Sequence, residues 1–163
     1  MALGDNTTAA ARGSSSRGRS PYMVQTVVDF ATALSDKGSA LAANDIIPCI
    51  AVPAGTLILN AGIQVDTVAS SGTTTLDLGT GTDVDCFVDG FDADDGTAAG
   101  TFAQNAAAYQ PILATAADTI DIKLATQSGT ALTTGKVRVF AVLMDVTDIG
   151  FGVATEAARD RLA

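Results

Sequence analysis

The side chains best suited to chemistry in this sequence are the carboxylates of one aspartate-rich stretch. The stretch contains Asp83, Asp85, Asp89, Asp92, Asp94 and Asp95. Carboxylate oxygens are the ligands that Ca²⁺ prefers, but the stretch lacks the glutamate that completes the binding loop of an EF-hand. Two interpretations stay open for residues 83–95: a cation site, or acids that face solvent in turns. We adopt the second and assign no metal ligand.

The absence of histidine from the sequence argues against an enzyme. Acid–base catalysis near neutral pH relies most often on histidine, and a nucleophilic serine or cysteine needs an adjacent base. Two aspartates can hydrolyse a glycoside, but the aspartates in these Gly-rich turns lack the aromatic residues of a sugar cleft. The segment Gly79-Thr80-Gly81 lacks the lysine of a phosphate-binding loop. We therefore predict no catalytic residue and no cofactor.

The two cysteines, Cys49 and Cys86, are too few for a disulfide framework and too far apart for a zinc knuckle. We interpret both as small apolar core residues. Hydrophobic residues make up 47% of the chain but aromatic residues only 5%, so Val, Ile, Leu and Ala must fill the interior. Such side chains suit the thin core between two packed β-sheets.

Charge is unevenly distributed along the chain, which has a net charge of −9. Residues 1–20 contain Arg12, Arg17 and Arg19 against one acid, whereas residues 21–150 contain four basic side chains against fifteen aspartates. The acidic part should repel nucleic acid and anionic membranes. The basic segment is rich in Gly, Ser and Ala and is predicted to be a flexible arm. It either docks on a partner or is an untethered terminus.

From residue 22 onward, apolar and polar residues alternate in short segments separated by Gly, Asp, Asn and Ser, which is typical of β-strands. The segment 136–146 alternates best, with Val137, Val139, Ala141 and Leu143 on one face. The other predicted strands are 22–31, 46–52, 56–67, 73–79, 84–88 and 119–125. Because no helices alternate with them, we predict one all-β domain over residues 21–150, an antiparallel β-sandwich of jelly-roll-like form. A short tail, 151–163, follows it.

Particular residues mark irregularities in these strands. Pro48 removes a backbone donor and so predicts a sheet edge or a bulge. Gly62 predicts a bend or bulge within the central strand 56–67. The remaining segments are expected to form turns or loops: 36–39, 70–72 (opening a hairpin into 73–79) and the long segment 89–108.

No stretch approaches the roughly 20 apolar residues of a membrane span, and the first residues are polar rather than apolar. We therefore expect no membrane association, and we expect the protein to be assembled in the cytoplasm.

Four segments carry a pattern that can be compared with known families. They are AVPAGTLILNAGIQVDT (51–67), LDLGTGTDVDCFVDG (76–90), ADTIDIKLAT (117–126) and GKVRVFAVLMDV (135–146). Together they resemble a group of small proteins of tailed phages that are typically encoded beside the major capsid protein. The resemblance covers most of residues 46–146, and none of its segments is a catalytic signature.

The resemblance implies a capsid decoration or cement protein. Such a protein is a β-sandwich on the virion exterior, often a homotrimer, that bridges neighbouring subunits of the major capsid protein. We expect Arg12, Arg17 and Arg19 to contact the capsid. An alternative is a receptor- or glycan-binding module of a phage head or fibre, with Tyr109 and residues 89–108 as its contact surface. A hydrolase that uses aspartate pairs is a third interpretation.

Overall fold

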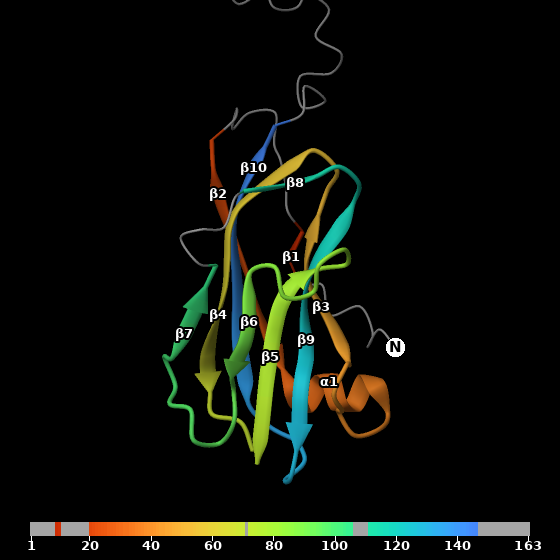
Figure 1. Ribbon diagram of the computed structural model, residues 1–163, viewed down its shortest axis with the longest axis vertical. Helices are drawn as coiled ribbons and strands as arrows, with labels where there is room; N and C mark the ends of the chain where they lie inside the picture. The colour runs from red at the N-terminus through yellow and green to blue at the C-terminus, as the bar shows by residue number, and fades with distance from the viewer. Residues whose placement is uncertain (1–8, 11–19, 71, 106–110, 147–163) are drawn as a thin grey trace, which may run out of the picture.

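Two β-sheets pack face to face in this protein, as the computed structural model shows (Figure 1). The structure describes residues 9–10, 20–70, 72–105 and 111–146. Sheet A contains, in spatial order, β1 (Ala9–Ala10), β3 (Ile46–Val52), β9 (Asp118–Ser128), β5 (Thr73–Thr80) and β6 (Val88–Asp92). Sheet B contains β2 (Tyr22–Asp29), β10 (Lys136–Asp145), β4 (Thr56–Thr67) and, both paired with β4, β7 (Phe102–Gln104) and β8 (Ile112–Ala114). One helix, α1 (Phe30–Lys37), follows β2.

The strand order interleaves distant parts of the chain. Apart from the parallel pair of β1 and β3, the paired strands run antiparallel. The strands β2, β3, β4 and β5 alternate between the sheets, and β2 and β3 pair with the late strands β10 and β9. This arrangement of two packed, mainly antiparallel sheets confirms the prediction of an all-β sandwich.

The core between the sheets is built from aliphatic side chains of both inner faces. The β10 face predicted to be buried, formed by Val137, Val139, Ala141 and Leu143, is at most 1% exposed, which confirms that prediction. The largest fully buried side chains are Phe30, Ile47, Ile50, Ile58, Ile63, Leu76, Leu78, Ile120, Ile122, Leu124 and Leu132. Phe30 is the one aromatic residue among them, so the low aromatic content agrees with a thin core.

The edge of sheet B beyond β4 consists of two short strands. β7 pairs with Gly62 to Gln64 of β4, and β8 pairs with Thr56 to Ile58 of the same strand. Both run antiparallel to β4. They are therefore two parts of one interrupted edge, each held by three residue pairs.

Helix α1 was not expected from the sequence, which predicted a strand to residue 31 and a turn at 36–39. The strand β2 ends at Asp29, whose carboxylate accepts a hydrogen bond from the backbone N–H of Ala31 at 2.9 Å and caps the helix. Gly38 ends the helix in the left-handed conformation that glycine adopts without a Cβ clash. The alternation of Tyr22 to Val28 therefore continues only to the cap.

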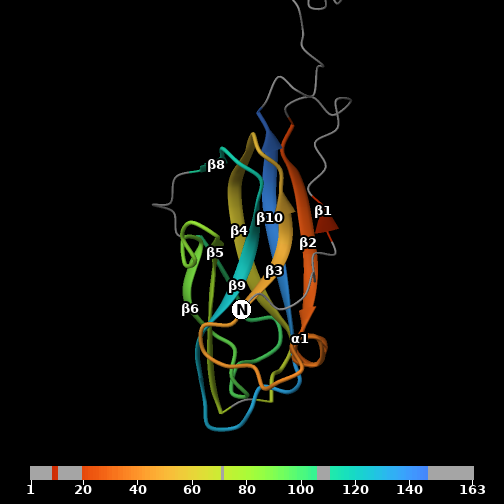
Figure 2. The ribbon, with the colours of Figure 1, turned by 90° about the vertical axis from the view of Figure 1, so that its right-hand side faces the viewer.

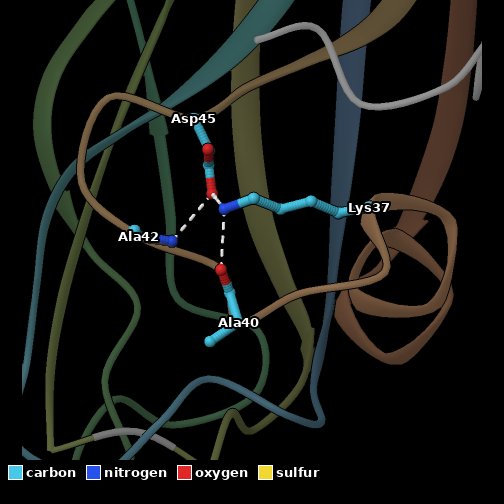
Figure 3. Close-up of polar contacts among 4 residues, drawn as sticks. All are labelled: Lys37, Ala40, Ala42 and Asp45. Atoms are coloured by element: carbon cyan, nitrogen blue, oxygen red, sulfur yellow. Dashed lines mark hydrogen bonds and ion pairs between the residues drawn. The ribbon is translucent and has the colours of Figure 1, made fainter.

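A largely buried ion pair between Lys37 and Asp45 ties the end of α1 to the loop that leads into β3 (Figure 3). The carboxylate of Asp45 accepts hydrogen bonds from Lys37 Nζ and, at 2.7 Å, from the backbone N–H of Ala42. Lys37 also donates to the carbonyl of Ala40 at 2.7 Å. Because these groups satisfy one another, the loop after the helix is held in one conformation although it has no regular secondary structure.

Two other expectations about the middle of the chain are wrong. Residues 70–72 do not open a hairpin, because β4 belongs to sheet B and β5 to sheet A. The strand expected at 84–88 begins only at Val88, and the expected loop 89–108 contains most of β6 and all of β7. The delay arises because the chain at Asp83 and Val84 folds back over Gly79, where a Cβ would collide with the backbone of both residues.

Pro48 and Gly62 mark different features. The pairing of β3 with β9 shifts register between Pro48 and Ile50, which confirms the bulge predicted from the proline. Gly62 is not at a bulge, since its register is regular and the shifts between β4 and β10 lie nearer the two ends of β4. A Cβ at Gly62 would collide with Cζ of the Phe140 ring and lie 2.6 Å from the carbonyl oxygen of Ala103. The glycine is required by this close packing.

We expect Gly62→Ala to destabilise the protein by about 2 kcal/mol, because the new methyl group must displace the Phe140 ring or the β7 backbone. Urea unfolding followed by circular dichroism measures this change. Gly96→Ala is the matched control, since the nearest atom to its Cβ is a side-chain oxygen of Asp94 at 3.1 Å. Adding Phe140→Leu should restore part of the loss. Equal unfolding midpoints for the two alanine variants would contradict the packing explanation.

Candidate functional site

The outer surface of sheet B carries large apolar side chains. Side chains alternate along a strand, so residues paired across strands lie on the same face. The register pairs Val142 with Met23, and Leu57 with both Met144 and Leu113. We define the apolar face as Met23, Val27, Leu57, Phe102, Leu113, Phe140, Val142 and Met144. The same register places the uncharged polar residues Gln25, Asn60 and Gln64 among them. Met23 is 61% and Phe102 63% exposed, which is unusual for side chains of this size.

The charged side chains beside the apolar face neutralise each other. Arg138 Nη2 lies 2.8 Å from Asp66 Oδ1, and Lys136 Nζ lies 3.0 Å from Asp29 Oδ2. The hydrogen bond from Lys136 lowers the pKa of Asp29 below its ordinary value. These two pairs stand at the end of the face near α1 and leave it without net charge. The face therefore offers another protein apolar contact without electrostatic repulsion.

The strands of sheet A are acidic by comparison. They contain one lysine, Lys123, and the aspartates Asp77, Asp89, Asp92, Asp118 and Asp121. Asp77 is 4% exposed and accepts hydrogen bonds from the backbone N–H of Gly90 at 3.0 Å and from Lys123 Nζ at 3.4 Å. Asp77 and Asp121 are buried, so the exposed acids on the strands of sheet A are Asp89 and Asp92 of β6. These two charges favour contact with solvent.

Asp121 is the most perturbed carboxylate of sheet A. It lies opposite Gly79 of β5, and the turn at Asp83 and Val84 passes over that glycine. The side chain is 8% exposed, and its Oδ1 has no hydrogen-bond partner among the described residues. Burial raises the pKa of Asp121 to about 6, against the effect of a hydrogen bond from Thr119, and the nearby Asp118 carboxylate raises it further.

The aspartate-rich stretch singled out from the sequence is spread along β6. Asp83 and Asp85 precede the strand, and Asp94 and Asp95 follow it. A strand of five residues separates its ends by about 15 Å. Asp94 accepts a hydrogen bond from the backbone N–H of Gly96 at 2.8 Å, as an acid does in a turn. Within the described residues, no group of three or more acids or cysteines is arranged to hold a metal ion.

The other residues selected from the sequence have different outcomes. Cys49 and Cys86 are both buried, which confirms them as core residues. The Cys49 thiol donates to the carbonyl of Ile47 at 3.1 Å, and burial raises its pKa to about 12. Arg12, Arg17, Arg19 and Tyr109 lie outside the described residues, as does the tail 151–163.

A hollow of about 280 Å³ lies at the end of the sandwich where β8 approaches β3. Val52, Ile58, Ile112 and several threonines line it, and Asp118 is the only charged residue of its lining. The lining therefore offers an apolar surface with hydroxyl groups, without a nucleophile paired with a base.

Among the described residues, no helix has the length and apolar character that a membrane span requires.

No family model matches the sequence, and no curated protein matches it. Solved structures do match the fold. A chain in the capsid of Ralstonia phage GP4 is 17% identical with a TM-score of 0.58, over 80% of this chain and 87% of that chain. The fold is one that occurs in phage capsids. A chain of the cyanophage Pam1 capsid asymmetric unit has a TM-score of 0.59 at 17% identity, covering 78% of this chain and 86% of that one.

A third match comes from the acid-stable capsid of the Helicobacter pylori bacteriophage KHP30. It has a TM-score of 0.52 at 13% identity, over 78% of this chain and 89% of that chain. The fold of each of these phage capsid chains thus aligns with most of the length of this protein. At these identities the match concerns the fold, and the residues of the apolar face must be considered on their own chemistry.

We expect the contribution of Asp121 to the stability of the protein to fall as the pH rises from about 4 to about 6. Because the folded state raises this pKa, it holds the proton more tightly than the unfolded state does in that window. Above pH 6 the charged carboxylate is buried at full cost. Asp121→Asn should therefore raise the free energy of unfolding by about 1 to 2 kcal/mol at pH 7 and by less at pH 4.

Urea titrations at the two pH values measure this difference. Asp95→Asn, at an exposed turn position, is the control for the loss of one negative charge. A stabilisation by Asp121→Asn that is equal at pH 4 and pH 7, or equal to that of the control, would show that the buried charge is not its cause.

Proposed function

We propose that this chain is a non-enzymatic structural protein of a phage virion that decorates the capsid and cements it by bridging subunits of the major capsid protein. The observation that carries the proposal is the fold, which phage capsid chains share over about four-fifths of this chain. In this proposal the protein sits on the virion exterior as a homotrimer, as the family resemblance implies. It is assembled in the host cytoplasm.

The difference between the two outer surfaces supports a preferred orientation on the capsid. Burying large side chains such as Met23 and Phe102 stabilises a contact by about 1.5 to 3 kcal/mol each. Burying the exposed aspartates of sheet A, Asp89 and Asp92, would instead cost free energy, because each must lose its hydration. The apolar face of sheet B therefore packs against the neighbouring protein, and the acidic side of sheet A faces solvent.

In this proposal the arm, residues 1–20, adds a second contact with the capsid to that of the apolar face. Arg12, Arg17 and Arg19 place guanidinium groups on acidic side chains of the capsid, for which their planar geometry is well suited. Each contact is weak by itself. Repetition over many copies on one particle multiplies the effect, so modest contacts are enough to retain the protein and to brace its neighbours.

Sedimentation with capsids stripped of this protein tests the proposal. The full-length chain should co-sediment to saturation, and Met23→Asp should weaken binding at least about tenfold, because it places an unpaired charge in the apolar face. Thr126→Asp adds the same charge at an exposed position of sheet A and should bind as the unchanged protein does. Replacing Arg12, Arg17 and Arg19 together by alanine should also weaken binding.

Circular dichroism must first show that each variant is folded. Equal binding by Met23→Asp and Thr126→Asp would remove the apolar face from the contact. If the full-length protein does not bind capsids at all, the cement function is wrong. The glycan-binding alternative would then be examined on a glycan array.

A further inference from the structure

The outer edge of β3 is the place where sheet A can accept another strand. β3 pairs with β9 along one side, from Ile46 to Val52. On its other side, among the described residues, it pairs only with β1, which aligns Ala9 with Ile50 and Ala10 with Ala51. An exposed edge of backbone N–H and C=O groups is a template for pairing with an additional strand. The β3 edge is thus a strand-binding surface occupied over two residues.

The strand that occupies this edge is joined to the sandwich by a long connection. β1 lies beside both β3 and β2 (Figures 1 and 2). Residues 11–21 separate it from β2, which begins at Tyr22. An extended connection of this length reaches about 40 Å, whereas two packed sheets lie only about 10 Å apart. The length of the connection therefore does not determine whose β3 receives the strand.

Charge favours an exchange between two copies. The segment 11–21 contains Arg12, Arg17 and Arg19 and no acid, whereas residues 21–150 contain four basic side chains and fifteen aspartates. Two sandwiches repel each other as bodies of like charge, but a basic connection that crosses from one to the other attracts the second sandwich. The exchange keeps the same backbone hydrogen bonds that the strand makes with its own chain, so it sacrifices no native contact.

We propose that the outer edge of β3 binds the N-terminal strand of a second copy of this chain, so that copies are linked by strand exchange. The interaction uses the backbone pairing of Ala9 and Ala10 of one copy with Ile50 and Ala51 of the other. It deepens the proposed function, on which its biological role rests, because copies held side by side on a capsid would be joined into a continuous layer. The exchange itself is a property of the purified protein.

Disulfide trapping between two single-cysteine copies tests the exchange. One copy carries Ala10→Cys, and a second copy, made larger by a tag, carries Ala51→Cys. The two positions are aligned in the β1–β3 pair, and neighbouring strands lie at a distance that a disulfide can bridge. Because each copy has only one introduced cysteine, a band of the summed mass reports pairing between copies. The native Cys49 and Cys86 are buried and do not compete.

The trapping reaction is carried out in solution at a protein concentration near millimolar. At this concentration the N-terminal strand of a second copy competes with the chain's own strand for the β3 edge. We expect the mixed disulfide to form at least about tenfold faster than with Thr126→Cys, an exposed control position in sheet A. Formation no faster than with the control would overturn the proposal. Failure to bind stripped capsids would contradict only the cement function, since the trapping measurement needs no capsid.

Discussion

The alternation of side chains along β10 is the constraint on which the rest of the structure depends. This strand pairs with β2 along one edge and with β4 along the other, so its side chains lie in the middle of both faces of sheet B. Its inward residues Val137, Val139, Ala141 and Leu143 lie in the centre of the core. Its outward residues Phe140, Val142 and Met144 form the centre of the apolar face. A shift of one residue would exchange the two sets. Folding stability and the exposed surface are therefore set by the same ten residues.

The sequence predicted what depends on neighbouring residues and missed what depends on contacts made across the fold. The strand 136–146 and the bulge at Pro48 follow from local chemistry. Asp29 and Gly38 also cap α1 through local contacts, but the alternation of the preceding residues predicted a strand to residue 31 instead. The start of β6 depends on the chain packing over Gly79, and Gly62 depends on Phe140, more than seventy residues away. The apolar face could not be predicted without the strand order, because it joins side chains from five strands.

Charge is sorted between the two sheets, although the sequence shows only an acidic chain. The aspartates around β6 looked like one cluster because they are close in sequence, but an extended strand places its ends far apart. Several acids are used instead to hold backbone: Asp45 binds the loop after α1, and Asp77 binds Gly90. The cations of sheet B are matched by partners at its margin. One outer surface is consequently neutral and the other acidic, which gives the sandwich two unlike sides.

The interrupted edge of sheet B has a consequence for how this protein can vary between relatives. β7 and β8 are each aligned on β4 by their own three residue pairs. The alignment of one strand therefore does not depend on the number of residues that separate it from the other. The chain can gain or lose residues between Asn105, which exchanges two hydrogen bonds with Ala61 of β4, and Ile112 while both strands keep their places on β4. At this position evolution, or a designer who wishes to display a foreign peptide, can insert new sequence without breaking the pairing of either strand with β4.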